Sequence, residues 1–552
     1  MNPRYFLGSQ GLLCVVMPIY AILVRQGLLA PFFVGFTITL LSCMSYATVI
    51  IVSLIKYDER SALYSSILFS IAIKSSVISS VTEGSLSYFG YNEFQRTSVL
   101  DVLSRGSFDR VATSKLFGNY ADFPLALIQG AAHTLISQAD PMVLHSWLGP
   151  VIFSLVVLPL LFTFFRRTLL LDARLSILGI VCVNSIYNAH NSLFMGYGTI
   201  SLILFAMALN CFHRRTRSDA ILFVVSVAAL AMTHPIPSYA LVLFALSYLT
   251  YSYAKQSNVG SASVMVALTA SLAASWLVFV MSYSIPGIRN VYALLIRNIS
   301  LPISIPESRY TTFSDPYGEL KIPLYAGQIV LMGLTTLGFL ALVRKRDKIN
   351  LAWLLPAELS FAGYTFAVAW GSMKLTDYSL RFIFYMNLLA IVMTSRGFLS
   401  VFESADKKLE RRRSVALGII LITLVTYSSV AAVPTYVFYR SYPVRSDEPI
   451  AYPHQWHSFG MFVRNRSVLP VSVWGAYNAI SAQSIAGQDM VNFYIENPSK
   501  KTKTALTALS DLNFRLHESH WASPLLSADT LASLSSRSNR VYDTGGVFAY
   551  LD

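Results

Sequence analysis

The chain has 552 residues, of which 54% are hydrophobic and only 13% are charged, and its formal net charge is +14. Soluble domains carry about 25% charged residues, so the composition excludes an ordinary soluble protein and indicates an integral membrane protein. The basic residues gather in short connections between apolar segments, a pattern that membrane topology explains and that argues against binding of nucleic acid.

Long apolar runs follow one another from the N-terminus to about residue 438. Each is close to the roughly 20 residues that a helix needs to cross a bilayer, and continuous runs exclude the alternating strands of a barrel. The split between the seventh and eighth runs rests on the short break "MTHPIPS". We therefore expect about thirteen transmembrane helices, at residues 7–24, 30–55, 62–81, 142–165, 173–189, 195–212, 219–233, 236–254, 262–284, 323–343, 350–370, 380–400 and 414–438.

The distribution of charge predicts the orientation. With the N-terminus in the cytoplasm, the inside connections contain "FRRTLLLDAR", "HRRTRS", "RKRDK" and "KKLERRR". This arrangement satisfies the positive-inside rule in a plasma membrane. An odd number of spans then places three long segments outside the cell: the connections 82–141 and 285–322 and the C-terminal residues 439–552.

The C-terminal residues differ in composition from the membrane domain, residues 1–438. They end in "NRVYDTGGVFAYLD", which predicts a β-hairpin with its turn at "DTGG". We expect residues 439–552 to form a small extracytoplasmic α/β domain. The four cysteines fall in apolar spans, where they are expected to pack in the core; they are Cys14, Cys43, Cys182 and Cys211.

The first long connection contains two amphipathic segments. Residues 91–106 end in Gly106, and the spacing of Phe94, Val99, Leu100 and Leu103 among charged residues can place these apolar residues on one side of a short helix. The second segment, "FPLALIQGAAHTLIS", has Pro124 in its first turn. Both are too short or too polar to span a membrane. They are expected to lie flat on its outer surface.

The motifs "NEFQRTSVLDVLSRG" and "YADFP" resemble the first outer loop of the GT-C glycosyltransferases, such as protein mannosyltransferases and aminoarabinose transferases. The general plan is similar as well, with "THPIPSYALVLFALSYL" after a middle break and "YSLRFIFYMNLLAIVMTS" late in the chain. The resemblance implies transfer of a sugar from a polyprenyl phosphate to a lipid or protein acceptor on the outer face of the membrane, with inversion. It implies no cofactor, and a divalent metal is possible but not indicated.

Such a transfer needs a base for the proton of the acceptor. The position of the catalytic Asp in the family corresponds to Asn92, which cannot act as a base, so the adjacent Glu93 is the first candidate. Glu83 and Asp101 are the alternatives.

The departing phosphate needs positive charge and hydrogen-bond donors. Candidate cations are Arg381, Lys374 and Arg297, and candidate substrate-binding residues are Asn92, Asp122, Tyr120, His190 and His234. Lys74 interrupts the third span, where it either reaches toward the interface or faces a polar cavity.

Two other classes of function stay open. A transporter or lipid flippase would show paired repeats and ionisable residues near the middle of the membrane, and no clear repeat is found. A non-catalytic relative of the GT-C enzymes is kept open by Asn92. The sugar and the acceptor do not follow from the sequence.

Overall fold

The structure is a computed structural model. It describes residues 3–25, 32–80, 99–110, 123–139, 151–169, 171–187, 197–211, 216–254, 259–283, 330–331, 333–342, 344, 385, 391–404, 411–430, 462–463, 465, 471–474, 491–494, 506–510, 539–543 and 547–551.

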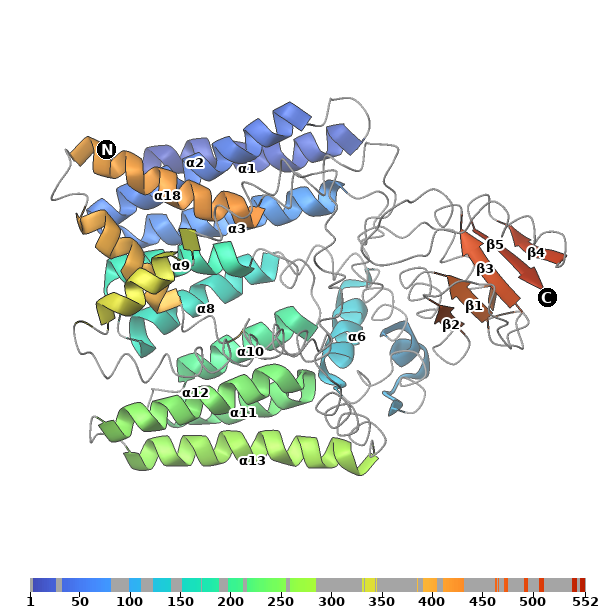
Figure 1. Ribbon diagram of the computed structural model, residues 1–552. Coiled ribbons are helices and arrows are strands. Elements are labelled where there is room, and N and C mark those ends of the chain that lie inside the picture. The colour runs from blue at the N-terminus through green and yellow to red at the C-terminus, as the bar shows by residue number, and fades with distance from the viewer. Residues whose placement is uncertain are drawn as a thin grey trace, which may run out of the picture.

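A bundle of helices forms most of the described chain (Figure 1). Its long members run roughly parallel or antiparallel to one another. The helical elements are α1 (Pro3–Arg25), α2 (Phe32–Lys56), α3 (Glu59–Ser80), α6 (Leu125–Ser137), η3 (Phe153–Val157), α8 (Leu158–Thr163), η4 (Phe164–Thr168), α9 (Ala173–Tyr187), α10 (Tyr197–Cys211), α11 (Arg217–Thr233), α12 (Pro235–Ala254), α13 (Val259–Tyr283) and α18 (Arg411–Val430).

These helices confirm the helical membrane character of the chain. Among the described residues, three helices are long and apolar enough to cross a membrane, through the segments Tyr5–Leu23, Thr37–Lys56 and Val259–Trp276. Of the other helices that coincide with predicted spans, α3 and α12 have 22 and 20 residues, whereas α9 and α10 are shorter as described. Both α9 and α10 have 15 residues, about 22 Å of helix, against a hydrocarbon layer of about 30 Å. The total of about thirteen spans stays a prediction, and the expected span 350–370 lies outside the described residues.

The division at "MTHPIPS" is confirmed, because α11 ends at Thr233 and α12 begins at Pro235. His234 stands between them in an extended conformation. The proline at the first position of α12 suits a helix start, since its missing N–H would have no partner there. The two helices pack against each other, as a helical hairpin does.

The N-terminal helices share one apolar core with helices from later in the chain. Residues of α1, α2, α3, α9 and α18 contribute to it, among them Tyr46 and Phe69, whose rings stack at 4.3 Å. Cys43, Cys182 and Cys211 are buried as predicted, whereas Cys14 is only half-buried.

A second core lies between α10, α11, α12 and the helix formed by η3, α8 and η4. This helix contains two π-helical segments, which flank α8. Each π turn widens the helix by about one residue per turn and rotates the side chains that follow. The aromatic rings of Phe164, Phe165 and Phe244 fill the space around it.

Two glycines allow the helical segments 333–342 and 391–404 to cross at very short range. A Cβ atom on Gly338 would clash with the carbonyl oxygen of Met393, and one on Gly397 would clash with that of Leu334. The hydroxyls of Thr335 and Thr394 form a hydrogen bond of 2.8 Å across the same crossing. Small residues with a polar contact are typical of tightly packed helices in membranes.

The C-terminal residues contain a five-stranded mixed sheet in the order β2-β1-β3-β5-β4. Its two parallel pairs are β1 with β2 and β1 with β3, and its antiparallel pairs join β5 to β3 and β4. The predicted terminal hairpin is confirmed as β4 and β5. The strands are β1 (Val471–Trp474), β2 (Val491–Tyr494), β3 (Leu506–Ser510), β4 (Asn539–Asp543) and β5 (Val547–Leu551). Outside the strands, the structure describes residues 462, 463 and 465 of this region, which are helical, so the α/β character of residues 439–552 stays a prediction.

Helix α6 and the sheet lie beyond the same end of the bundle (Figure 1). We call it the loop end, since α3 leads there into the first long connection. At the opposite end, Arg166 of η4 forms an ion pair of 2.8 Å with Glu59 at the start of α3, and Arg174 of α9 lies 3.5 Å from Glu403. The side of the membrane on which this end lies stays a prediction.

The glycine crossing generates a test of packing. We expect Gly338→Ala to lower the free energy of unfolding by about 1 to 3 kcal/mol, because the added methyl group meets backbone atoms that cannot rotate away. Gly333→Ala, in the same helical segment, is the matched control, because a Cβ there meets nothing within 4 Å. Thermal unfolding of both purified variants in detergent measures the difference, and equal stability would contradict the close crossing.

Candidate functional site

The first amphipathic segment of the long connection is helical over residues 99–105. Val99 and Val102 are buried, whereas Leu100, which the sequence placed on the same apolar side, is 41% exposed. The helix ends at Gly106, whose φ of +66° is left-handed, and the Gly106 N–H donates to the carbonyl of Leu103. Glycine adopts this conformation without strain, so the motif's final residue is a helix stop.

The second amphipathic segment forms α6, which starts directly after Pro124 as predicted. Its buried residues include Ala126, Leu127 and Ala131, which pack against Val99 and Val102. Ile200 of α10 belongs to the same cluster, so the two short helices are held together and fixed onto the bundle. We call these six residues the loop cluster.

A second face of α6 is apolar and exposed. Ile128, Leu135 and Ile136 are 42%, 68% and 83% exposed. Their spacing of i, i+7 and i+8 places them on one side of the helix. An apolar face of this kind at the end of a membrane bundle fits a helix that lies in the interfacial region of a bilayer.

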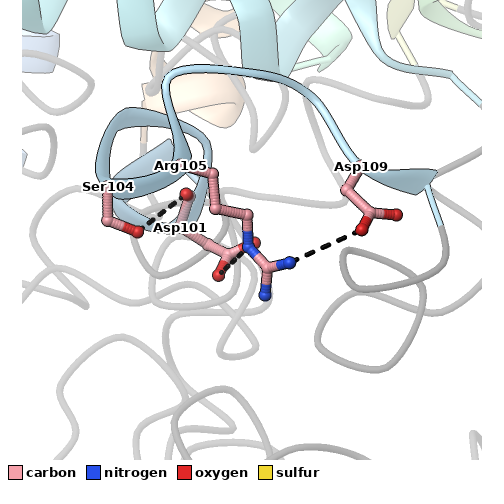
Figure 2. A network of polar contacts seen from close by, with 4 residues as sticks. All are labelled: Asp101, Ser104, Arg105 and Asp109. Carbon is pink, nitrogen blue, oxygen red and sulfur yellow. Dashed lines mark hydrogen bonds and ion pairs between the residues drawn. The ribbon is translucent and has the colours of Figure 1, made fainter.

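Asp101, one of the alternative bases, lies on the helical segment 99–105 and is engaged by a neighbouring cation. Arg105 Nε donates to Asp101 Oδ1 at 3.0 Å, and Arg105 Nη1 reaches Asp109 at 3.5 Å (Figure 2). The other oxygen of Asp101 is buried and has no hydrogen-bond partner among the residues that the structure describes. Arg105 thus ties the carboxylate to its own helix, as is common for i, i+4 pairs.

His234, a candidate substrate-binding residue, lies close to the "YADFP" motif. Its ring stands 6.4 Å from the ring of Phe123, the residue before Pro124. Phe123 in turn packs against the loop cluster. The backbone N–H of Ile236 donates to His234 Nδ1 at 3.2 Å, which assigns the hydrogen of the neutral ring to Nε2. The structure therefore brings together two motifs that lie more than a hundred residues apart in the sequence.

The remaining predicted site residues lie outside the described part of the chain, so their geometry stays a prediction. They are Glu93, Glu83, Asn92, Arg381, Lys374, Arg297, Asp122, Tyr120 and His190.

Beneath the loop end, a row of buried polar side chains follows α3. Ser65 exchanges hydrogen bonds with Gln10 of α1, at 2.6 and 2.9 Å. One turn of helix later, Ser70 pairs with Ser154 of η3 at 3.0 Å. We call this row the polar seam; its members are Gln10, Ser65, Tyr46, Ser66, Asn184, Ser70 and Ser154.

Lys74 continues the seam toward the loop end and differs from its members. It is completely buried, and its Nζ has no hydrogen-bond partner in the part of the chain that the structure describes. The Nζ lies 3.1 Å from the centroid of the Phe153 ring. The contact of a desolvated cation with an aromatic face stabilises it by about 2 kcal/mol. Desolvation of a buried ion costs several kcal/mol, so the Phe153 ring alone does not compensate for burial of a charged amine.

Phe153 was not found by sequence reasoning, because an apolar residue in an apolar run carries no signal. Lys74 was found through its charge. Their contact depends on η3 packing against α3, which only the three-dimensional structure reveals.

Within the described ranges, no group of three or more His, Cys, Asp or Glu residues is placed to hold a metal ion. No protein-family model and no curated protein matches the chain.

The helix stop at Gly106 can be tested directly. Gly106→Ala is expected to destabilise the end of helix 99–105 by about 1 to 2 kcal/mol, because a Cβ disfavours the left-handed conformation while open space surrounds it. Amide hydrogen exchange in residues 99–105 should accelerate about tenfold. Gly106→Asn is the control and should accelerate exchange less, since Asn tolerates this conformation. Unchanged exchange in the Ala variant would show that the stop is not needed.

Proposed function

We propose that the chain is a GT-C-like glycosyltransferase that moves a sugar from a polyprenyl phosphate to a lipid or protein acceptor on the outer face of the membrane. One observation carries the proposal. The described parts of the loop motif form a helix that ends at Gly106 and a helix that begins after Pro124, and both pack on one cluster at the loop end. This arrangement supports the resemblance, because the motif residues are organised as one unit over the bundle.

In the proposed reaction, a hydroxyl oxygen of the acceptor attacks the anomeric carbon of the sugar. The bond from that carbon to the phosphate oxygen breaks, and polyprenyl phosphate leaves with the electron pair. Glu93 accepts the proton of the hydroxyl, and Arg381, Lys374 and Arg297 are proposed to stabilise the phosphate. A single displacement inverts the anomeric centre.

The described candidates take subsidiary roles in this proposal. Asp101 ranks after Glu93 as a base, because Arg105 occupies one of its oxygens. His234 is proposed to donate its Nε2 hydrogen to a sugar or phosphate oxygen. Its ring is oriented for this by the bond from Ile236 and by the contact with Phe123.

Transport or flipping of a lipid is the second candidate function. One observation favours it: Lys74 and the polar seam place ionisable and polar groups inside the bundle, as transporters do. The proposed enzyme uses the same lipid phosphate, so the two candidates differ in whether a glycosidic bond is broken.

The deciding experiment measures transfer of radiolabelled sugar from a panel of polyprenyl phosphate sugars to extracted lipids and proteins. Membranes containing the wild type are expected to transfer label, and Glu93→Gln should lower the rate about 100-fold or more, since the amide cannot accept the proton. Arg381→Ala should weaken the use of donor. Glu403→Gln is the matched control, because this exposed carboxylate lies at the opposite end of the bundle, and it should transfer as the wild type does.

Each other outcome has a definite meaning. Transfer that survives in Glu93→Gln but collapses in Asp101→Asn or Glu83→Gln would move the base to that residue. A folded wild type that transfers no sugar from any donor would overturn the proposal and favour the non-catalytic or transporter alternatives.

A further inference from the structure

The buried polar side chains of the polar seam form hydrogen bonds between helices. Each of its members forms at least one hydrogen bond to a side chain or carbonyl of a neighbouring helix. Such bonds hold transmembrane helices together, and they account for the seam as a structural device. Lys74 differs from the members of the seam, because its amine has no hydrogen-bond partner among the described residues. Some buried hydroxyls elsewhere in the described bundle, such as those of Ser42 and Ser53, also have none, but Lys74 has the only lysine amine among these atoms.

Lys74 is also grouped with the nearest hydroxyls of the seam. Ser70 precedes it by four residues on α3, and Ser70 and Lys74 therefore lie on one face of the helix. On the facing element, Ser154 bonds Ser70 and the adjacent Phe153 covers the amine of Lys74. A cation and a pair of hydroxyls thus meet at the contact of α3 with η3.

The covering element is π-helical. Phe153 begins a π-helical segment, and such segments often occur at functional sites because their hydrogen bonding is irregular. The residue before it, Ile152, packs against the loop cluster. The amine is thereby linked through η3 to the same cluster that Phe123 contacts.

We propose that Lys74, with the hydroxyls of Ser70 and Ser154, forms a binding site for the phosphate group of a lipid, and that the Phe153 ring covers this site. A phosphate oxyanion would supply the partner that the amine lacks, through charge-assisted hydrogen bonds. An intramembrane cation without a partner is retained for a ligand more readily than for stability. The choice of a polyprenyl phosphate as ligand rests on the proposed function.

The test measures equilibrium binding to the purified full-length protein in detergent, with three probes: polyprenyl monophosphate, the corresponding polyprenol and inorganic phosphate. Lys74→Met should weaken binding of polyprenyl monophosphate about tenfold or more, since hydrogen bonds to a charged group are lost. Lys74→Arg should retain most of the affinity. Lys56→Met is the matched control at an exposed lysine at the opposite end of the bundle and should bind as the wild type does.

The probes separate two sources of phosphate. Binding of the polyprenyl monophosphate that depends on Lys74, with no such dependence for polyprenol, supports the site. If inorganic phosphate competes with equal affinity, the site is one for free phosphate and the lipid part of the proposal is overturned. Wild-type affinity for the polyprenyl monophosphate in Lys74→Met overturns the site altogether.

A second measurement uses the wild type, so it does not depend on whether the Lys74→Met variant folds. A polyprenyl phosphate carrying a diazirine next to the phosphate is cross-linked to the wild type, and adducts are expected within residues 70–77 or 151–157. Adducts confined to other segments would contradict the proposal. Because binding is measured apart from sugar transfer, the outcomes are distinguishable. If polyprenyl monophosphate binds through Lys74 but no sugar is transferred, the binding site is supported and the proposed transferase activity is overturned. If sugar is transferred and the transfer is unaffected in Lys74→Met, the transferase activity is supported and the binding site is overturned.

Discussion

The need to satisfy polar groups inside a helical bundle, without help from water, governs this structure. Hydrocarbon offers no hydrogen bonds, so a buried polar side chain can be satisfied only by another group of the protein. The hydroxyls of α3 do this in turn, reaching α1 at Ser65, α2 at Ser66 and η3 at Ser70. The side chain of Asn184 on α9 donates to the backbone carbonyl of Ser66. Because each bond has its own partner helix, the row fixes both the rotation of α3 and the order of the helices around it.

Close packing of side chains and backbone also fixes how the helices are arranged. At Gly338 and Gly397 two helical segments approach until backbone faces backbone. At Gly179 the absent side chain leaves room for the ring of Phe165, whose nearest atoms would stand 2.9 Å from a Cβ. At this position a large ring fills the space that the missing side chain leaves, as dense packing requires. The functional segments rest on this rigid base, since the loop cluster includes Ile200 of α10.

Hydropathy and the residues that begin or end helices and turns predicted the elements well, because both depend on local chemistry. The break at His234, the start of α6 after Pro124, the stop at Gly106 and the terminal hairpin all follow from the properties of single residues or short turns. Leu100 was placed on the wrong side, because helical spacing tells which residues share a face but not which neighbour covers it.

Single residues of the candidate site could be predicted from the sequence, but the contacts between them could not. The sequence singled out Asp101 and His234, but the bond from Arg105, the contact of His234 with Phe123, and the cover of Phe153 over Lys74 are tertiary facts. Each depends on the packing of segments that are distant in the chain. Glu93 and Arg381 lie outside the described residues, so their roles stay predictions from the sequence.

The packing of α18 against α2 has a consequence for how the protein is made. Ile51 and Cys43 of α2 belong to the same core as Ile422 and Val425 of α18, and Gly418 lets the side chain of Ile51 approach closely. More than three hundred residues separate these partners, so α2 leaves the ribosome long before α18 is synthesised. Until then, the face of α2 that α18 will cover is exposed to lipid or to an insertion factor. The N-terminal helices can therefore be inserted early, but their bundle closes late in biogenesis.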